Sequence, residues 1–470
     1  MFLRFFFIIL CVCFIILGSF LHLKRSDFEQ NNAAFVFKSS GFTPDTKNPQ
    51  NKASVNKQIQ ITTKSDLSQF QFFESGSHLL VPNFEKSAHA SALLDLDSKL
   101  MVVFFAGSRE GARDVKIYGS FLSKGSMYWN EPKPLIDAQM LSHLSGKFIR
   151  KVGNPIVFKD SFNRVHLFVV GVSLGGWATS KIYQFRFDEA LDNIEYLGEL
   201  HLGVFANFSH LVRTPALSLE NGGFMLPFYY ELADKYPLVG FFDKDSKLLF
   251  TKKLHNFKSQ LQPSVIPLSS SDCLAVFRIH RSHDNKMFLQ QCKDFGNTWE
   301  APYKSNLQNF DSSSVLLNIN GEVILVHNDG LDNPLLLLYD LFHEKVRIHP
   351  RASLSLFWLR DKSKGEFVRL MTLDALKDGE VSYPAAVSDD TNLYISYTYD
   401  RKQIKSIIVS LDSIFELIKQ DRESLEEIHL ESLVPDTSQT NRDSTDLDSE
   451  TITEEQKWEL HKFDYLRDVG

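Results

Sequence analysis

The chain has no long run of basic residues, and its formal net charge is −7 over 470 residues. A nucleic-acid-binding surface needs clustered lysine and arginine to contact phosphates, so the sequence predicts no nucleic-acid partner. Histidine, cysteine and carboxylate side chains do not gather at the spacing of metal ligands, so we expect neither a metal ion nor another cofactor. A local basic pocket for an anionic ligand remains compatible with this overall charge.

Cysteine is scarce, with four in the whole chain. Cys11 and Cys13 lie in an apolar N-terminal segment, whereas Cys273 and Cys292 lie at the ends of two strands that the sequence predicts to pair. If Ile279 faces Lys286 in this hairpin, Cys273 faces Cys292 and a cross-strand disulfide is geometrically allowed. A disulfide would fit an oxidising compartment. Two free buried thiols fit the pattern equally well.

Only one long hydrophobic run is present, from Phe5 to Leu23, preceded by Arg4 and followed by Lys24 and Arg25. About 20 apolar residues are needed to cross a bilayer. No small-x-small cleavage site follows, so we interpret residues 1–25 as a membrane anchor, with a cleaved signal segment as the alternative. Both interpretations place the rest of the chain in the periplasm or outside the cell, although the charges on both flanks leave the orientation open.

Long amphipathic helix patterns are missing between about residue 70 and residue 412. Short runs of Val, Ile, Leu, Phe and Tyr alternate there with turn residues, which predicts strands. Residues 26–68 are polar and indicate a linker from the membrane. After the strand-rich region 69–412, residues 413–470 predict a short helix at Ser413–Ile418 and an acidic, largely disordered tail.

The strand-rich region repeats a unit made of a strand, a turn and a second strand. The six units begin at His89, Asn154, Arg213, Gln262, Ser312 and Tyr383. Repeats at intervals of roughly 50–70 residues predict an all-β, six-bladed propeller. Either Phe70–Phe73 or His78–Val81 would then complete the last blade. A two-sheet sandwich is the alternative fold, but it does not account for the repeat.

One short motif supports this architecture. Residues Asp294-Phe295-Gly296-Asn297-Thr298-Trp299 match the Asp-box pattern, in which glycine takes a positive φ and the aspartate bonds the amides of the turn. Trp299 would cover the hairpin with a large apolar face. We therefore expect a structural role for this motif and no catalytic one.

Polar residues at strand ends are the candidates for function, because propeller sites lie on the central axis. His89, Arg213 and Gln262 begin blades. Arg109, Arg278 and Arg401 follow or end second strands. Arginines that converge on one axis repel one another unless an anion lies between them, and their forked geometry suits a carboxylate. A surface ion pair is the alternative for any single one of these arginines.

The loop between Phe105 and Tyr118 is the candidate for acid–base chemistry. It lies between the second and third strands of the first blade and carries Asp114, which could act as a general acid over the axis. Glu110 is the rival residue for that role. A solvated charged turn is the alternative interpretation.

With the Asp-box and the blade pattern, the chain resembles the sialidase (neuraminidase) superfamily with BNR/Asp-box repeats over about residues 75–410. The resemblance implies exo-hydrolysis of an α-ketosidic bond. It assigns Asp114 as acid/base, Tyr383 in Val-Ser-Tyr-Pro as nucleophile and Arg278 as a carboxylate ligand. A tyrosine nucleophile avoids placing a carboxylate against the carboxylate of the substrate.

The sequence departs from the family pattern at three places. The first blade opens with His89-Ala-Ser instead of Arg-Ile-Pro, and Gln262 replaces the glutamate that activates the tyrosine. No arginine is evident in the fifth blade near His327. We expect Arg213 and Arg401 to supply the missing cations and Glu231 to supply the base.

These departures leave the substrate open between sialic acid and a Kdo-type sugar acid on a glycoconjugate or glycolipid. An anchored, exported enzyme of this kind resembles the Kdo hydrolases that act on lipopolysaccharide. Activity on neither sugar would favour a propeller that only binds, or would imply a missing membrane partner subunit. A catalytically inactive carbohydrate-binding or scaffold propeller is the alternative from a different functional class.

Overall fold

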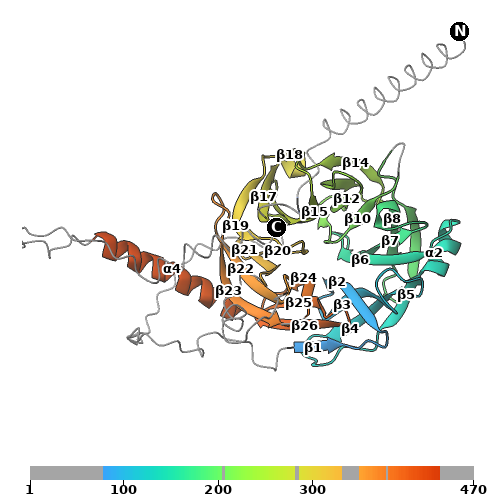
Figure 1. Cartoon of the computed structure of the whole chain (residues 1–470), viewed down its shortest axis with the longest axis horizontal. Helices are drawn as coiled ribbons and strands as arrows, with labels where there is room; N and C mark the ends of the chain where they lie inside the picture. The colour runs from blue at the N-terminus through green and yellow to red at the C-terminus, as the bar shows by residue number, and fades with distance from the viewer. Residues whose placement is uncertain are drawn as a thin grey trace, which may run out of the picture. The chain divides into compact units, whose positions relative to one another are not determined.

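The computed structural model describes Phe37 and residues 78–203, 207–280, 285–330, 349–376 and 379–433. Within these residues, six antiparallel sheets surround a central axis, which confirms the predicted six-bladed propeller (Figure 1). The predicted anchor at residues 1–25, the strand at Phe70–Phe73 and the tail beyond Leu433 lie outside the described residues. No helix in the described part of the chain is both long enough and apolar enough to span a bilayer.

The first three blades follow one another along the chain. Blade one contains β2 (Ser87–Asp95), β3 (Lys99–Gly107), β4 (Lys116–Ser123) and β5 (Lys133–Asp137). Blade two contains β6 (Lys151–Lys159), β7 (Val165–Val172), β8 (Ser180–Phe187) and β9 (Ile194–Glu199). In blade three, β10 (His210–Val212) and β11 (Leu217–Ser218) both pair with β12 (Phe224–Tyr230), followed by β13 (Tyr236–Phe242) and β14 (Leu248–Lys253).

The other three blades complete the ring. Blade four contains β15 (Gln260–Pro267), β16 (Cys273–Ile279), β17 (Lys286–Lys293), β18 (Thr298–Trp299) and β19 (Tyr303–Gln308). Blade five contains β20 (Val315–Ile319), β21 (Glu322–Asn328), β22 (Ser353–Asp361) and β23 (Glu366–Ala375). Blade six contains β24 (Val381–Ser388), β25 (Asn392–Tyr399), β26 (Gln403–Ser410) and, from the start of the domain, β1 (His78–Val81).

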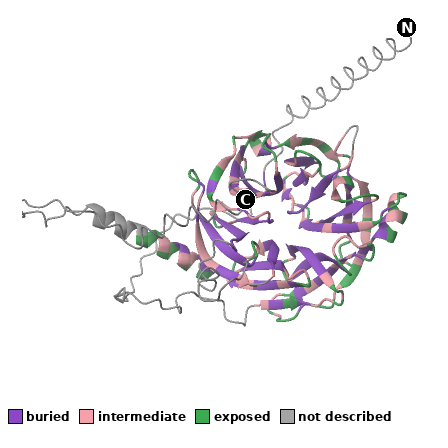
Figure 2. Ribbon diagram, viewed as in Figure 1, coloured by how far each residue is buried: buried purple, intermediate pink, exposed green. Residues whose placement is uncertain are grey.

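Strands close to the axis are apolar along almost their whole length. Every residue of β7 is buried, and β3 is buried from Leu100 to Gly107. Such strands are covered on both sides by neighbouring blades, so continuous runs of Val, Ile, Leu and Phe form them in place of an alternating pattern. Figure 2 shows the buried residues concentrated in the inner part of the ring.

Four inner strands contain a bulge near their first residues. The pairing register shifts beside Ala90, Asn154, Gln262 and Tyr383, and these residues have φ of 53°, 43°, 47° and 56°. A bulge re-aims side chains and often lies beside a functional site. The bulges occur at the end of the ring where the sequence places the site. The opposite end, formed by the turns between first and second strands, is called the far face below.

The Asp-box hairpin has its predicted structural form. Cys273 pairs with Cys292 and the two form a disulfide, so the disulfide alternative is confirmed and the free-thiol alternative is wrong. Gly296 has φ of 82°, and Asp294 Oδ2 accepts a hydrogen bond from Thr298 Oγ1 at 2.8 Å. Trp299 pairs with Cys292 and donates from Nε1 to the carbonyl of Gly296 at 2.8 Å.

Two helices accompany the strands. Helix α2 (Ala138–Ser145) is capped at its start by Asp137, whose side chain accepts a hydrogen bond from the Met140 amide. Helix α4 (Leu411–Leu433) starts at the end of β26 and continues well past the predicted Ser413–Ile418. Its first residues, including Ile414 and Ile418, are buried with the core between blades five and six. The chain separates into one compact unit up to Ile418 and a second from Lys419.

Phe37 is an unexpected part of the propeller. The sequence places it in the polar linker 26–68, yet its side chain is only 1% exposed and packs into the core between blades three and four. Its backbone bridges to Leu219, and its amide donates to the carbonyl of Ser270 at 3.0 Å. This part of the linker is therefore attached to the propeller.

Candidate active site

Tyr383 lies at the centre of the charged cluster on the axis. The bulge at the start of β24 holds it at φ of 56°, and its side chain is 8% exposed. Arg278, near the end of β16, donates from Nη1 to the Tyr383 hydroxyl at 2.7 Å. The His89 ring lies 4.4 Å from the Tyr383 ring. The structure thus brings together three of the predicted site residues.

Three guanidinium groups surround the Tyr383 ring. Those of Arg213, Arg351 and Arg278 lie 5.2, 5.7 and 5.9 Å from its centroid. They come from blades three, five and four, so cations from three of the six blades contact one aromatic side chain. We call the group of Tyr383, these three arginines and His89 the arginine pocket.

The sequence did not identify Arg351 as a site residue. The expected position for a fifth-blade arginine was near His327, at the end of β21, but Arg351 lies just before β22 and beyond the undescribed residues 331–348. A residue that follows a long connection between two strands cannot be located from the spacing of the repeat, because the length of the connection varies from blade to blade. The available signal was the Pro350-Arg351 pair immediately before the apolar run of β22.

Asp311 organises one side of the arginine pocket. Its carboxylate accepts a hydrogen bond from Arg278 Nε at 2.6 Å and lies 3.2 Å from His280 Nδ1, while its carbonyl accepts one from Arg351. Burial raises the pKa of Asp311, but the nearby Arg278 outweighs this and the net shift is downward. Burial lowers the pKa of Arg278, but Tyr383 and Asp311 reverse this and leave it above its usual value.

Glu380 organises the other side. It lies 3.5 Å from Arg351 Nη1, accepts from Arg401 Nε at 2.9 Å, and accepts from the Ser382 hydroxyl at 2.9 Å. Arg401 also pairs with Glu110 on the loop of blade one. Arg401 therefore joins that loop to blade six. Like Arg351, Glu380 was not singled out in the sequence.

Arg213 is held deep in the pocket. It is 3% exposed and donates to the carbonyls of Ser91 at 3.1 Å and Pro384 at 2.8 Å. Its Nε has no partner among the described residues. Burial lowers the pKa of Arg213 to about 10, so it remains charged at neutral pH.

His89 is a neutral neighbour of these cations. Burial lowers its pKa well below the usual value, and the charges of Arg401 and Arg351 lower it further. A neutral imidazole therefore occupies the position at which the sialidase pattern has an arginine. Its Nδ1 has no hydrogen-bond partner among the described residues.

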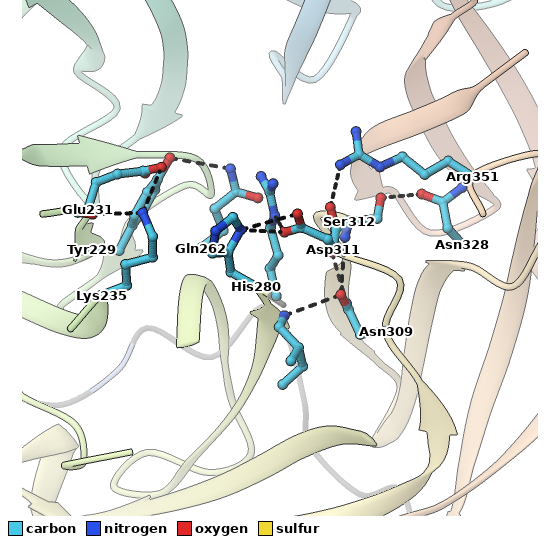
Figure 3. Close-up of polar contacts among 12 residues, drawn as sticks. Tyr229, Glu231, Lys235, Gln262, His280, Asn309, Asp311, Ser312, Asn328 and Arg351 are labelled. Carbon is cyan, nitrogen blue, oxygen red and sulfur yellow. Dashed lines mark hydrogen bonds and ion pairs between the residues drawn. The ribbon is translucent and has the colours of Figure 1, made fainter. Parts of the chain in front are cut away.

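Gln262 and Glu231 lie on the side of blades three and four (Figure 3). Gln262 Nε2 donates to the hydroxyl of the buried Tyr229 at 3.3 Å. Burial raises the pKa of Tyr229, and the charge of Glu231 raises it further. Glu231 itself lies 3.5 Å from Lys235 Nζ. None of the hydrogen bonds among the described residues joins Glu231 to Tyr383, so its role as a base stays a prediction.

Asp114 lies on the exposed loop of blade one. Its carboxylate accepts from the amide and the hydroxyl of Ser108, both at 2.9 Å. The side-chain hydrogen bond from Ser108 is the main cause that lowers the pKa of Asp114. Arg109 is exposed on the same loop. The described contacts do not join Asp114 to Tyr383, so its role as an acid also stays a prediction.

Two cavities of the described residues are lined by residues outside the arginine pocket. One of about 330 Å³ follows the axis toward the far face and is lined by Thr214, Ser264, Leu316 and Ala386, among others. Another, of about 490 Å³, lies between the far-face turns of blades one and two. No group of three metal-ligating side chains occurs in the described part of the chain. Convergent charge distinguishes the candidate site.

Comparisons with known proteins agree with this architecture. The BNR repeat-like domain family matches residues 98–395. A protein of unknown function from Dyadobacter fermentans has 13% identity and a TM-score of 0.53, with 71% of this chain and 97% of that one covered. A Hadza microbial sialidase has 13% identity and a TM-score of 0.54, with 70% and 66% covered.

A sialidase from Trypanosoma rangeli, solved with the inhibitor DANA, has 13% identity and a TM-score of 0.52, with 76% of this chain and 61% of that chain covered. This chain therefore matches less than two thirds of the length of either sialidase. No curated protein sequence matches. At this identity, the likeness to the solved structures shows the fold alone.

Proposed function

The chain belongs to the BNR repeat-like domain family, and we propose that its propeller hydrolyses the α-ketosidic bond of a terminal 2-keto-3-deoxy sugar acid. The observation that carries the proposal is the hydrogen bond from Arg278 to the Tyr383 hydroxyl, inside a ring of three guanidinium groups. One solved structure of this fold is a Trypanosoma rangeli sialidase in complex with sialic acid.

The charge of the pocket suits such a substrate. Arg278 and Arg351 present forked donors toward the same ring, and a planar carboxylate matches that fork. Asp311 and Glu380 hold the two arginines in place from behind. A substrate carboxylate bound here would bring its anomeric carbon near Tyr383.

Tyr383 would act as the nucleophile. Its oxygen would attack the anomeric carbon while the glycosidic bond breaks, and water would then release the sugar acid from the enzyme. Guanidinium groups already in place stabilise negative charge that develops on the phenol oxygen. The neutral His89 would pack beside the ring without adding charge.

Asp114 would protonate the leaving oxygen. Its hydrogen bonds to Ser108 favour the charged carboxylate, so the loop would have to release Ser108 before Asp114 could donate a proton. The pair between Arg401 and Glu110 ties this loop to blade six. Glu231 would assist Tyr383 as the base, through water or after a shift away from Lys235.

A trapping experiment tests the proposal directly. A 2,3-difluoro sugar acid slows the second step, so a covalent adduct should accumulate and be found by mass spectrometry on the peptide that contains Tyr383. Tyr383→Phe removes one oxygen and should abolish both the adduct and the release of sugar acid from aryl ketosides. Tyr303→Phe is the matched control, because Tyr303 lies on β19 and donates only to the Lys362 carbonyl.

The identity of the sugar is tested in the same way. Sialosides and Kdo ketosides, each with its difluoro analogue, would be compared with the purified protein. A preference of about tenfold corresponds to roughly 1.4 kcal/mol in transition-state binding. An adduct on a residue other than Tyr383 would contradict the assigned nucleophile.

A carbohydrate-binding propeller is the second candidate function. The observation in its favour is the absence of any carboxylate bonded to the Tyr383 hydroxyl among the described residues, with Gln262 bonded to Tyr229 instead. In that case sugar acids would bind and Arg278→Lys would weaken binding, but neither adduct nor hydrolysis would be detected.

We also propose that residues 1–25 anchor the protein in a membrane, with the propeller in the periplasm or outside the cell. This rests on the apolar run from Phe5 to Leu23. An alkaline extraction of membranes tests it, because an anchored chain stays in the membrane fraction and a chain with a cleaved signal is released.

A further inference from the structure

Phe37 is attached to the propeller far from the arginine pocket. It bridges to Leu219, just after β11, and its amide bonds to Ser270, in the turn between β15 and β16. Both contacts lie at the far-face ends of inner strands; Arg213, just after β10, and Gln262, near the start of β15, lie at the opposite ends. The eight residues of β15, Gln260–Pro267, span roughly 25 Å at about 3.3 Å per residue. Phe37 therefore docks on the far face.

The contact of Phe37 with the propeller combines burial of its side chain with a backbone hydrogen bond, as a specific binding site does. Phe37 is 1% exposed and packs with Leu217, Leu219 and the core that contains the Cys273–Cys292 disulfide. Fully burying a phenylalanine side chain stabilises by about 1.5–3 kcal/mol. One backbone hydrogen bond orients the segment as well.

We propose that Phe37 is a latch that holds the N-terminal segment against the far face, so that a lipid bilayer holding residues 5–23 lies on that side and the arginine pocket faces away from it. The proposal assigns the far face as the membrane-proximal surface of the propeller. It rests on the proposed membrane anchor at residues 1–25, and it does not depend on the proposed glycosidase activity.

The length of chain between the apolar run and Phe37 favours one orientation of the propeller over the other. Without the latch, the first attached residue would be His78, and the chain from Leu23 to His78 spans up to about 190 Å. With it, the chain from Leu23 to Phe37 spans at most about 50 Å, whatever its conformation. To turn the pocket toward the bilayer, this shorter segment would have to pass around the edge of a blade.

That path uses almost all of the available length. The segment would first cross four strands, about 15–20 Å at about 4.8 Å between strands, and then climb the roughly 25 Å height of the ring. About 40–45 Å of the 50 Å would be consumed, which requires a nearly extended chain and costs conformational entropy. The outward-facing orientation needs no such extension.

The orientation also restricts the targets of the pocket. A pocket that faces away from its own bilayer meets soluble glycoconjugates or an opposing surface, and not acidic lipids in the membrane that holds the anchor. Glycolipids of the same bilayer would come within reach without a nearly extended tether when Phe37 is released.

Energy transfer to the membrane tests the proposal on the full chain. The protein would be reconstituted in liposomes that carry a headgroup acceptor dye, on a Cys11→Ser, Cys13→Ser background. A donor label would be attached at Phe162→Cys on the far face or at Leu232→Cys next to Glu231; both native side chains are exposed. Transfer from position 162 should exceed that from position 232 by at least about twofold, as expected for labels about 25 Å apart in height.

Phe37→Ser should remove most of this difference, whereas the matched variant Phe84→Ser, at a side chain that is 79% exposed, should leave it unchanged. Phe37→Cys combined with Leu219→Cys provides a second measurement, because directly paired residues are close enough for a disulfide. That disulfide should form under oxidising conditions and preserve the difference in transfer.

Two results would overturn the proposal. If the full chain does not float with liposomes, the bilayer is not its partner. If it floats but the two labels give equal transfer before and after Phe37→Ser, the latch does not set the orientation. Neither result involves the reaction at Tyr383, so the outcome is separate from that of the trapping experiment.

Discussion

At the scale of single residues, the arginine pocket is close to electrical balance. Four arginines lie in or beside it, namely Arg213, Arg278, Arg351 and Arg401. Three carboxylates pair with them, namely Glu110, Asp311 and Glu380. One positive charge remains uncompensated when His89 is neutral. A single carboxylate would complete the balance, which agrees with an acidic sugar as ligand.

Arg351→Lys tests whether the fork of the fifth-blade arginine matters. Lysine keeps the charge but cannot contact both the Asp311 carbonyl and Glu380 as Arg351 does. We expect kcat/KM on an aryl ketoside to fall about 100-fold, or roughly 2.7 kcal/mol of transition-state stabilisation. Arg360→Lys, on the outer part of β22 beside Glu366, is the control. Equal activity of both variants would contradict a role for Arg351 in substrate binding.

Buried histidines predict a pH dependence of stability. Burial lowers the pKa of His210 and of His255 to about 4, and it lowers that of His89 well below the usual value. The unfolded chain then binds protons that the folded chain cannot bind, so this contribution to stability is complete above pH 6.5 and is lost as the pH falls toward 4. Each histidine contributes a loss of about 1.4 kcal/mol per pH unit in this window.

Urea denaturation of the protein at several pH values measures this slope. His255→Asn should reduce the slope between pH 6 and pH 4.5 by about one bound proton. A slope that is the same in both proteins would show that His255 does not titrate differently on folding.

Only part of the site could be predicted from the sequence. Tyr383 and Arg278 follow from their places in the repeat, because blade starts and second-strand ends meet at the axis in every propeller. Arg351 and Glu380 lie in connections before β22 and β24, where no repeat spacing applies. Their contacts with Tyr383, Arg401 and each other depend on how blades five and six face one another, which spacing along the chain does not encode.

At the scale of elements, the bulges of the inner strands set the site. Asn154, Gln262 and Tyr383 each have a positive φ, and each precedes a proline. Such a backbone is strained for residues other than glycine, and strain of this kind concentrates at functional sites. The sequence indicated strand starts at these positions but not bulges, since bulges appear only in the pairing register.

Trp299→Ala tests the Asp-box hairpin as a folding element. The ring is partly buried, covers Cys292 and bonds to the Gly296 carbonyl, so its removal should lower the free energy of unfolding by about 2–4 kcal/mol. The catalytic constants of the folded fraction should not change. Tyr128→Ala, at a ring that is 82% exposed, is the control and should cost less than about 0.5 kcal/mol. A loss of activity without a loss of stability would contradict the structural role.

The hairpin also shows which features of the structure a local sequence pattern can predict. Pairing of Cys273 with Cys292 follows from the turn position alone, and the structure confirms it. Whether the thiols are joined depends on distance as well as register, so the sequence left two alternatives. The docking of Phe37 had no signal of this kind, because one aromatic residue in a polar segment shows no periodicity.

At the scale of the whole molecule, the ring is closed by residues from its two ends. Strand β1 pairs with β26 along His78–Val81, as one of the two alternatives from the sequence predicted. Leu79 and Val81 are buried there, while β24 of the same blade carries Tyr383 at the axis. The first strand of the domain therefore supports the blade on which the nucleophile would lie.

Removal of β1 should open the ring at blade six. A head domain of residues 84–420 loses the burial of Leu79 and Val81, which together stabilise by about 3–6 kcal/mol, whereas a head domain of residues 76–420 retains both. The shorter protein also exposes the edge of β26, which lies next to β1 in the sheet, and exposed strand edges promote aggregation. We expect a lower midpoint in chemical denaturation and a concentration-dependent loss of soluble protein. Equal midpoints for the two proteins would mean that the ring does not depend on its N-terminal strand, and that Tyr383 is positioned by β24 to β26 alone.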